Sequence, residues 1–434
     1  MRRILLVTLV LLGLTSAPAE AKINLQPFMG WSSWSVESST RATYGTNWLT
    51  EGNIRNAADA MAAKIASAGY TSLNIDSGWN ATLNWQSHFD GNGIPEADST
   101  RFPSGLPSLS SYVHGKGLKL GLYMPAGLDH GVYDANLPIA GTSCHTRDIA
   151  VNPLTATNKW GSHWKIDYGT SCAQSYISSI VAKFASWNVD FIKVDGVTQD
   201  NVPDMRAWST AIDRSGRAMW LTASAWPVDR AAAPGLRPYA NSVRIDTDVE
   251  CYCGTISTWT SSVDKRWADL PNWLNDVGPN FWPDLDAMPI SNNRGQAIQD
   301  GINDVERQSV MTFWSMASSP LYVGGDIYFM DSTAISILTN PEVIAVDQAG
   351  VLPQQVTGGN LQKWRKRMPD GSWVVAVYNL GSSSANITVN WSDISLSGSH
   401  PVRDLAARRD LGAFTNSWTA TGVPAHGSRL IKVS

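Results

Sequence analysis

The sequence predicts an α/β fold: a (β/α)8 TIM barrel followed by a C-terminal antiparallel β-sandwich domain. From residue 28 to about residue 346, short apolar runs alternate with longer segments whose apolar residues recur every three or four positions. This alternation is typical of βα units around a parallel sheet. From about Leu352 the pattern changes to short alternating segments with Gly and Ser at the turns, as in a sandwich. We therefore expect a barrel over residues 22–348 and a β domain over residues 349–434.

Eight apolar runs supply the expected barrel strands. They are residues 28–31, 71–75, 119–123, 190–194, 218–223, 242–245, a weak run at 278–282, and 320–323. Helical patterns lie between them, for example at 53–67, 173–187 and 305–316. In the tail, residues 373–379 and 385–391 are predicted to be antiparallel strands. Eight units within about 320 residues fit a barrel with loop insertions.

The N-terminus predicts export. Residues 1–21 contain two arginines, an apolar run over residues 4–14 and small residues ending at Ala21, which is the pattern of a secretory signal peptide. The apolar run is shorter than the roughly 20 residues that span a bilayer. We expect a secreted, extracellular protein with disulfides. The four cysteines allow three pairings, of which we expect Cys144–Cys172 with Cys251–Cys253.

Composition excludes several partners. With 33 Lys and Arg against 37 Asp and Glu, the net charge is −4, so no basic field attracts nucleic acid or, after signal cleavage, a membrane surface. The His and Cys residues lack metal-site spacing, and no Gly-rich phosphate loop occurs, so we expect no metal and no cofactor. The chain has 20 Trp against 12 Tyr and 9 Phe. Indole rings suit stacking on sugars as well as core packing.

Acidic residues follow three of the expected strands. Asp76 ends the second, Asp195 ends the fourth two residues after Lys193, and Asp246 and Asp248 end the sixth. In such a barrel the active site lies at these strand ends. Any one of these Asp side chains could instead cap a helix. Carboxylates without a metal favour glycoside hydrolysis, in which one carboxyl group acts at the anomeric carbon and another protonates the leaving oxygen. The alternative class is an inactive secreted carbohydrate-binding protein.

Eight segments resemble, in the same order, the motifs of glycoside hydrolase family 27, the α-galactosidase (melibiase) and α-N-acetylgalactosaminidase group. They are residues 28–34 (PMGWNSW in the family), 74–79 (NIDDCW), 118–123 (LKLGIY), 192–196 (LKYDGC), 244–248 (an Arg and an Asp four residues apart), 282–288 (WNDPDML), 319–321 (SPL) and 340–348 (NxEVIAINQD). The resemblance extends over residues 27–350. It implies the same two-domain fold and exo-acting, retaining hydrolysis of a terminal α-galactosyl unit through a covalent glycosyl-enzyme.

The resemblance also assigns roles to residues. Asp195 matches the nucleophile, and the neighbouring Lys193 cation would favour its ionised form. Asp248 matches the general acid/base, with Asp246 as the alternative because we expect it on the same side of the strand. The positions that match sugar contacts or pocket walls are Trp31, Asp76, Tyr123, Lys193, Arg244 and Asp286. Asp286 could equally brace loops.

Two departures from the family pattern concern the sugar. Ser77 stands where many members have a second Asp that binds the axial 4-hydroxyl of galactose. In the strand-five segment (SCEWP in the family), Ala225 precedes Trp226 at the position that reads sugar C2. Losing a hydrogen-bonding group changes substrate discrimination. The alternatives are therefore β-L-arabinopyranosidase, isomaltodextranase or another α-glycosidase activity, each acting on a glycoside, oligosaccharide or polysaccharide.

Tryptophans at the expected strand ends are candidates for the pocket wall. They are Trp31, Trp34, Trp79, Trp226 and Trp282. Trp187, Trp373 and Trp391 lie within helical or strand patterns, and we expect them in the core.

Overall fold

A computed structural model describes residues 26–158, 160–250, 252–293 and 298–434. The predicted signal peptide lies outside these ranges. Eight parallel strands form one curved sheet in the order β10-β1-β2-β3-β6-β7-β8-β9. The strands are β1 Met29–Ser32, β2 Ser72–Ile75, β3 Lys119–Pro125, β6 Phe191–Asp195, β7 Trp220–Ala223, β8 Ser242–Arg244, β9 Trp282–Asp284 and β10 Leu321–Val323. This arrangement confirms the predicted barrel.

The seam between β9 and β10 is closed by the chain that follows β9. The Met288 N–H donates to Tyr322 O at 2.7 Å, and Gly324 N–H donates to Met288 O at 3.0 Å. The weak run predicted at 278–282 is not itself the strand, because Gly278 and Phe281 exchange two backbone hydrogen bonds in a tight turn. The strand begins at Trp282, where that turn ends.

Helices cover the outside of the sheet. The longer ones are α2 Glu51–Lys64, α3 Gly105–Gly115, α5 Ser171–Ser186, α6 Val202–Ser215, α8 Lys265–Trp273, α9 Asp304–Ala317, α10 Ser332–Leu338 and α11 Pro341–Gln348. The amphipathic α5 shows why they form, since it buries Tyr176, Ile180 and Phe184 at four-residue spacing. Its N-cap Thr170 accepts a hydrogen bond from Ala173 N at 3.3 Å.

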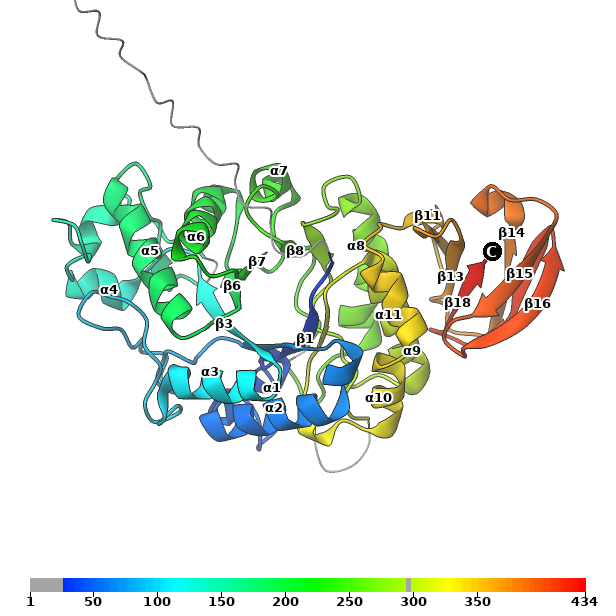
Figure 1. Ribbon diagram of the computed structural model, residues 1–434, viewed down its shortest axis with the longest axis horizontal. Coiled ribbons are helices and arrows are strands. Elements are labelled where there is room, and N and C mark those ends of the chain that lie inside the picture. The colour runs from blue at the N-terminus through cyan, green and yellow to red at the C-terminus, as the bar shows by residue number, and fades with distance from the viewer. Residues whose placement is uncertain (1–25, 159, 251, 294–297) are drawn as a thin grey trace, which may run out of the picture.

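The C-terminal segment forms a β-sandwich, as predicted, at one end of the molecule (Figure 1). Its larger sheet has the order β11-β12-β13-β18-β15-β16, and β14 pairs with β17 in the second sheet. Bounds are β11 Gln354–Thr357, β12 Leu361–Arg367, β13 Trp373–Asn379, β14 Ala385–Asn390, β15 Ser399–Asp404, β16 Arg409–Thr415, β17 Ser417–Val423 and β18 Ser428–Val433.

The larger sheet buries both of its faces. On β13, Val375 and Val377 belong to the sandwich core, whereas Val374, Ala376 and Tyr378 belong to the core shared with the barrel. On the barrel side, every residue of α9 from Ser309 onwards is buried. The helix is covered on one side by the barrel and on the other by β13 and β18. The two domains therefore pack through a continuous apolar layer.

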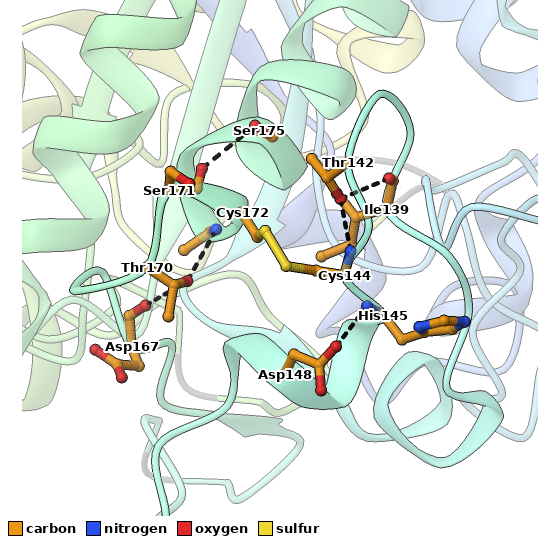
Figure 2. Close-up of a disulfide and its surroundings, with 11 residues drawn as sticks. Ile139, Thr142, Cys144, His145, Asp148, Asp167, Thr170, Ser171, Cys172 and Ser175 are labelled. Carbon is orange, nitrogen blue, oxygen red and sulfur yellow. Dashed lines mark hydrogen bonds between the residues drawn. A yellow bond between two sulfur atoms is a disulfide. The ribbon is translucent and has the colours of Figure 1, made fainter.

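A long excursion joins β3 to α5 over residues 126–170. It contains β4 Leu128–Asp129, α4 His130–Ala135, η3 Thr146–Ile149 and β5 His163–Trp164. The predicted Cys144–Cys172 disulfide ties the excursion to the first turn of α5 (Figure 2). Cys251 lies outside the described residues, so its pairing with Cys253 stays a prediction. Among the described helices, none combines the length and apolar character needed to cross a membrane.

Candidate active site

The carboxyl ends of the barrel strands open into a cavity of about 1050 Å³. Eight of the eleven residues predicted to act on or bind a sugar line it. They are Asp76, Ser77, Tyr123, Lys193, Asp195, Ala225, Trp226 and Asp248. Parallel strands that end at one rim explain why residues far apart in sequence meet here.

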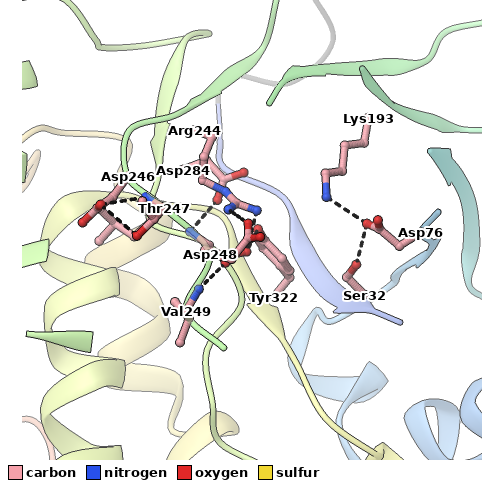
Figure 3. A network of polar contacts seen from close by, with 12 residues as sticks. Ser32, Asp76, Lys193, Arg244, Asp246, Thr247, Asp248, Val249, Asp284 and Tyr322 are labelled. Carbon is pink, nitrogen blue, oxygen red and sulfur yellow. Dashed lines mark hydrogen bonds and ion pairs between the residues drawn. The ribbon is translucent and has the colours of Figure 1, made fainter. Parts of the chain in front are cut away.

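Lys193 and Asp76 form the first charged pair of the site. Lys193 Nζ lies 2.9 Å from Asp76 Oδ2, which also accepts from Ser32 Oγ at 3.4 Å (Figure 3). The same oxygen accepts from Asn74 Nδ2 at 3.3 Å. Asp76 Oδ1 accepts from Ser77 N–H at 2.9 Å. Burial lowers the pKa of Lys193, but the carboxylates of Asp76 and Asp195 outweigh it, so the pKa is raised overall. The ammonium group therefore keeps its charge beside both carboxylates.

Asp195 is the last residue of β6, two positions after Lys193. Its Oδ1 accepts from Gly196 N–H at 2.8 Å. On the neighbouring strand, Tyr123 lies opposite Lys193 in the register. Burial, and then the charges of Asp195 and Asp76, raise the pKa of Tyr123 well above its ordinary value. The Tyr123 hydroxyl therefore stays protonated and neutral near the carboxylates of Asp195 and Asp76.

Arg244, the last residue of β8, binds two carboxylates at once. Its Nη1 lies 2.7 Å from Asp248 Oδ1, and its Nη2 lies 2.7 Å from Asp286 Oδ1. Asp286 also accepts from Tyr322 Oη at 2.9 Å and from Val249 N–H at 2.7 Å. Figure 3 shows Arg244, Asp248 and Tyr322 gathered in this network. The guanidinium thus fixes the position of Asp248 relative to β8 and β10.

The two carboxyl groups on Arg244 have opposite pKa shifts. Burial raises the pKa of Asp248, and Asp286 adds to the rise, so that the opposing effect of Arg244 is outweighed. Burial also raises the pKa of Asp286, but there Arg244, with Arg266 and Lys193, lowers it below its ordinary value overall. These opposite pKa shifts allow Asp248 to hold and donate a proton while Asp286 stays ionised.

The structure places Asp246 away from the cavity, which corrects our expectation that it shares a face with Asp248. Its Oδ1 accepts from Thr247 N–H at 2.7 Å, and its Oδ2 lies 3.4 Å from Arg266 of α8. Its carboxyl group lies apart from Asp248 in Figure 3. Side chains alternate between the two faces only within a strand, and β8 ends at Arg244, two residues before Asp246.

Three predicted sugar-binding residues are not among those that line this cavity, although Trp31 and Asp286 line a small second cavity that shares Lys193 with it. Arg244 is 1% exposed and bound to the two carboxylates. Asp286 is buried, and both of its oxygens accept from protein donors, so it braces the loop after β8. Trp31 is also buried and donates from Nε1 to Gly325 O at 2.7 Å.

The predicted tryptophan wall is only partly correct. Trp34 and Trp226 line the cavity. Trp79 is fully buried between β3 and α5, where its Nε1 donates to Tyr123 O at 2.8 Å. Trp282 is fully buried in a cluster with Phe191 and Trp220.

Sequence reasoning missed two further tryptophans that line the cavity. Trp85 lies in the loop between β2 and α3, and Trp160 lies in the β3–α5 excursion. Both side chains are about half exposed. The sequence signal that could have identified them is an indole within a polar loop. No group of three or more His, Cys, Asp or Glu suited to a metal occurs in the described part of the chain.

Replacing Arg244 with Met should destabilise the fold strongly, because it leaves Asp286 buried without its cation. We expect a loss of about 3–5 kcal/mol in the free energy of unfolding, measured by denaturant titration with circular dichroism. Arg230→Met is the matched control, since its 2.7 Å pair with Asp276 lies at the surface. The control should lose less than about 1 kcal/mol. Equal losses in the two variants would contradict the role of Arg244 as a buried brace.

Comparison with known proteins agrees with this architecture. A family model described as "Alpha galactosidase A" matches residues 26–138 and 154–349. A second, described as "Alpha galactosidase C-terminal beta sandwich domain", matches residues 358–433. An α-galactosidase of Coffea arabica is 31% identical over 420 residues, which cover 94% of this chain and 93% of that protein.

Solved structures give the same result. A β-L-arabinopyranosidase from Geobacillus stearothermophilus, of glycoside hydrolase family 27, superposes with a TM-score of 0.85 at 27% identity over 94% of this chain and 96% of its own. α-Galactosidase I from Mortierella vinacea gives 0.72 at 26% identity over 95% of this chain and 97% of its own. The order of the strands, the sandwich and these matches together show that the chain belongs to glycoside hydrolase family 27, the α-galactosidase (melibiase) family.

Proposed function

We propose that this glycoside hydrolase is secreted and removes terminal α-galactosyl units with retention of anomeric configuration. One observation carries the proposal. Asp195 and Asp248 line the same cavity, the first beside the Lys193 ammonium and the second with a raised pKa. Retaining hydrolysis requires one ionised carboxylate and one protonated carboxyl group. Secretion is supported by the pattern of residues 1–21.

In the first step, Asp195 attacks the anomeric carbon and forms an ester bond to the sugar. The bond to the leaving oxygen breaks as that oxygen takes the proton of Asp248. In the second step, Asp248 removes a proton from water, whose oxygen attacks the anomeric carbon and releases Asp195. Asp76 and Lys193, already held 2.9 Å apart, would hydrogen-bond the sugar hydroxyls.

A β-L-arabinopyranoside is the second candidate substrate. Ser77 and Ala225 line the cavity at the two positions where the family pattern has stronger hydrogen-bonding groups. Arabinopyranose resembles galactose without C6 and needs fewer contacts. The Geobacillus stearothermophilus relative is a β-L-arabinopyranosidase, and a variant of it has been solved in complex with arabinose.

A panel of p-nitrophenyl glycosides tests the proposal. We expect hydrolysis of the α-galactoside with a kcat/KM at least about tenfold above that of the α-glucoside, with the β-L-arabinopyranoside as the third substrate. Asp195→Asn should lower kcat by about 10⁴-fold or more, because the nucleophile is lost. Wild-type failure on all three glycosides, with glycan binding retained, would favour the non-catalytic carbohydrate-binding alternative. An active Asp195→Asn enzyme would refute the nucleophile assignment.

The pH dependence of kcat/KM should report on Asp248. Because its pKa is raised, Asp248 keeps its proton to higher pH than an ordinary Asp, and its ionisation would set the basic limb. Tyr252 Oη donates to Asp248 Oδ2 at 2.8 Å and so favours the ionised form. Tyr252→Phe removes that donor and should move the basic limb to higher pH by about one unit.

Tyr239→Phe serves as a control for this experiment, because Tyr239 is not among the described residues that line the cavity. It should leave the pH profile in place. A basic limb that moves to lower pH in Tyr252→Phe would show that another group donates the proton.

A further inference from the structure

Helix α9 connects the C-terminal sandwich to the charged network of the active site. Strands β13 and β18 of the sandwich pack on one side of the helix, and the barrel covers the other. After the last turn of α9 the chain passes through Ser319 into β10, which carries Tyr322. Tyr322 Oη donates to Asp286 Oδ1 at 2.9 Å. The end of α9 is therefore continuous with the barrel wall next to Asp286.

The side chain of Lys366, on β12 of the sandwich, reaches this end of α9. Lys366 is 1% exposed, and its Nζ donates to Ser315 O at 3.0 Å, to Ser318 Oγ at 2.9 Å and to Val346 O at 3.0 Å. These acceptors belong to the C-terminal ends of α9 and α11. Carbonyl groups there lack helical partners, and the helix dipole favours a cation. One amino group of the sandwich thus caps two helices of the barrel.

All three N–H bonds of the Lys366 ammonium group are used in this cap. The single proton of Ser318 Oγ serves the backbone oxygens of Asp347 and Val351, at 3.2 and 3.0 Å, so Ser318 Oγ accepts from Lys366. Three acceptors require three donors, which a lysine has only when it is protonated. Burial lowers the pKa of Lys366 to about 7, so the complete cap is present on the acid side of neutrality.

Residues around the capped turn hold the backbone next to Asp286. Trp314 Nε1 donates to Asp286 O at 2.7 Å, and Ser319 Oγ accepts from Leu285 N–H at 3.0 Å. Asp286 has a φ of 75°, a left-handed conformation that a residue other than glycine keeps only when its surroundings hold it there. The conformation of Asp286 therefore depends on the position of the last turn of α9.

Arg244 relates the position of Asp286 to that of Asp248. Its Nη2 binds Asp286 and its Nη1 binds Asp248, each at 2.7 Å. A guanidinium group is planar and rigid, so the two carboxylates bound to it fix one another's positions. Proton transfer needs the donor within hydrogen-bond reach of the leaving oxygen, and a displacement of about 1 Å can cost a large part of the rate.

We propose that Lys366 is a positioning residue for the proton donor Asp248. It caps the end of α9 that holds Asp286, and Asp286 acts on Asp248 through Arg244. The C-terminal sandwich then takes part in catalysis although none of its described residues lines the cavity. This inference rests on the proposed function of Asp248 and adds the domain that positions it.

The leaving group of the substrate distinguishes positioning from stability alone. Methanol leaves slowly unless its oxygen is protonated, whereas p-nitrophenol leaves readily as the phenolate. A misplaced Asp248 carboxyl group should therefore lower kcat/KM for methyl α-galactoside more than for p-nitrophenyl α-galactoside. A smaller amount of folded protein lowers both values equally. Asp248→Asn gives the full size of the difference.

Lys366→Met keeps the length of the buried side chain and removes its ammonium group. Measured on folded protein on the acid side of neutrality, it should lower the ratio of kcat/KM for the methyl glycoside to that for the p-nitrophenyl glycoside by about tenfold. Trp314→Phe, which removes the indole donor, should lower the ratio too. Lys363→Met is the matched control, because Lys363 also lies on β12 but pairs with Asp393 within the sandwich at 2.6 Å. It should leave the ratio unchanged.

Equal losses on the two glycosides in folded Lys366→Met would overturn the positioning role, because they would reflect stability alone. If this variant does not fold, Ser318→Gly removes one acceptor of the cap at a position whose φ of 52° suits glycine. Ser318→Gly should lower the ratio by about threefold, which corresponds to one weakened hydrogen bond. An unchanged ratio in Ser318→Gly would also overturn the inference.

Crystal structures separate failure of this inference from failure of the proposed function. Lys366→Met should lengthen the contact between Arg244 Nη2 and Asp286 Oδ1 beyond about 3.5 Å, whereas Lys363→Met should keep it at 2.7 Å. An unchanged contact in Lys366→Met would overturn the positioning role while the glycosidase activity stands. A lengthened contact in a protein whose wild type hydrolyses neither glycoside would support the link and refute the proposed activity.

Discussion

The candidate site depends on one buried guanidinium. Arg244 lies at the end of β8 and binds both Asp248, which lines the cavity, and the buried Asp286. Asp286 in turn accepts hydrogen bonds from Tyr322 of β10 and from the backbone that follows Asp248. Removing one partner of such a buried set leaves an uncompensated charge. Each charged group in the network therefore depends on the others.

The same network lies where the barrel is least supported by its backbone. β9 and β10 are joined by a bridge at Met288 rather than by a ladder of strand hydrogen bonds. Asp286 and Tyr322 connect the two sides of this seam through their side chains. Closure of the barrel and placement of the proposed proton donor are therefore coupled. The opposite wall, with Lys193, Asp76 and Asp195, rests on fully paired central strands.

Most of the fold was predictable because its signals are periodic. Seven of the eight barrel strands, and the strands at 373–379 and 385–390, overlap their predicted positions, whereas β9 begins only where its predicted run ends. Most of the predicted polar residues meet in the cavity because parallel strands end at a common rim. Asp246 was misplaced since β8 ends before it, and strand alternation has no meaning beyond that point.

Which tryptophans line the cavity was harder to predict, for a physical reason. An indole at a strand end serves the core as well as a pocket, so position alone did not separate Trp79 and Trp282, which are buried, from Trp34 and Trp226, which line the cavity. Trp85 and Trp160 lie in irregular loops, where no periodicity predicts the direction of a side chain. These loops line part of the cavity, and their shape follows from long-range packing and, in the β3–α5 excursion, from a disulfide.

The stereochemistry of the first product tests the central claim most directly. Proton NMR of a fresh digest records the anomer that is released before mutarotation. With an α-galactoside, double displacement through Asp195 and Asp248 predicts that α-galactose appears first and converts to the β anomer later. Initial release of β-galactose would mean a single displacement by water, and it would contradict the assignment of Asp195 as a nucleophile.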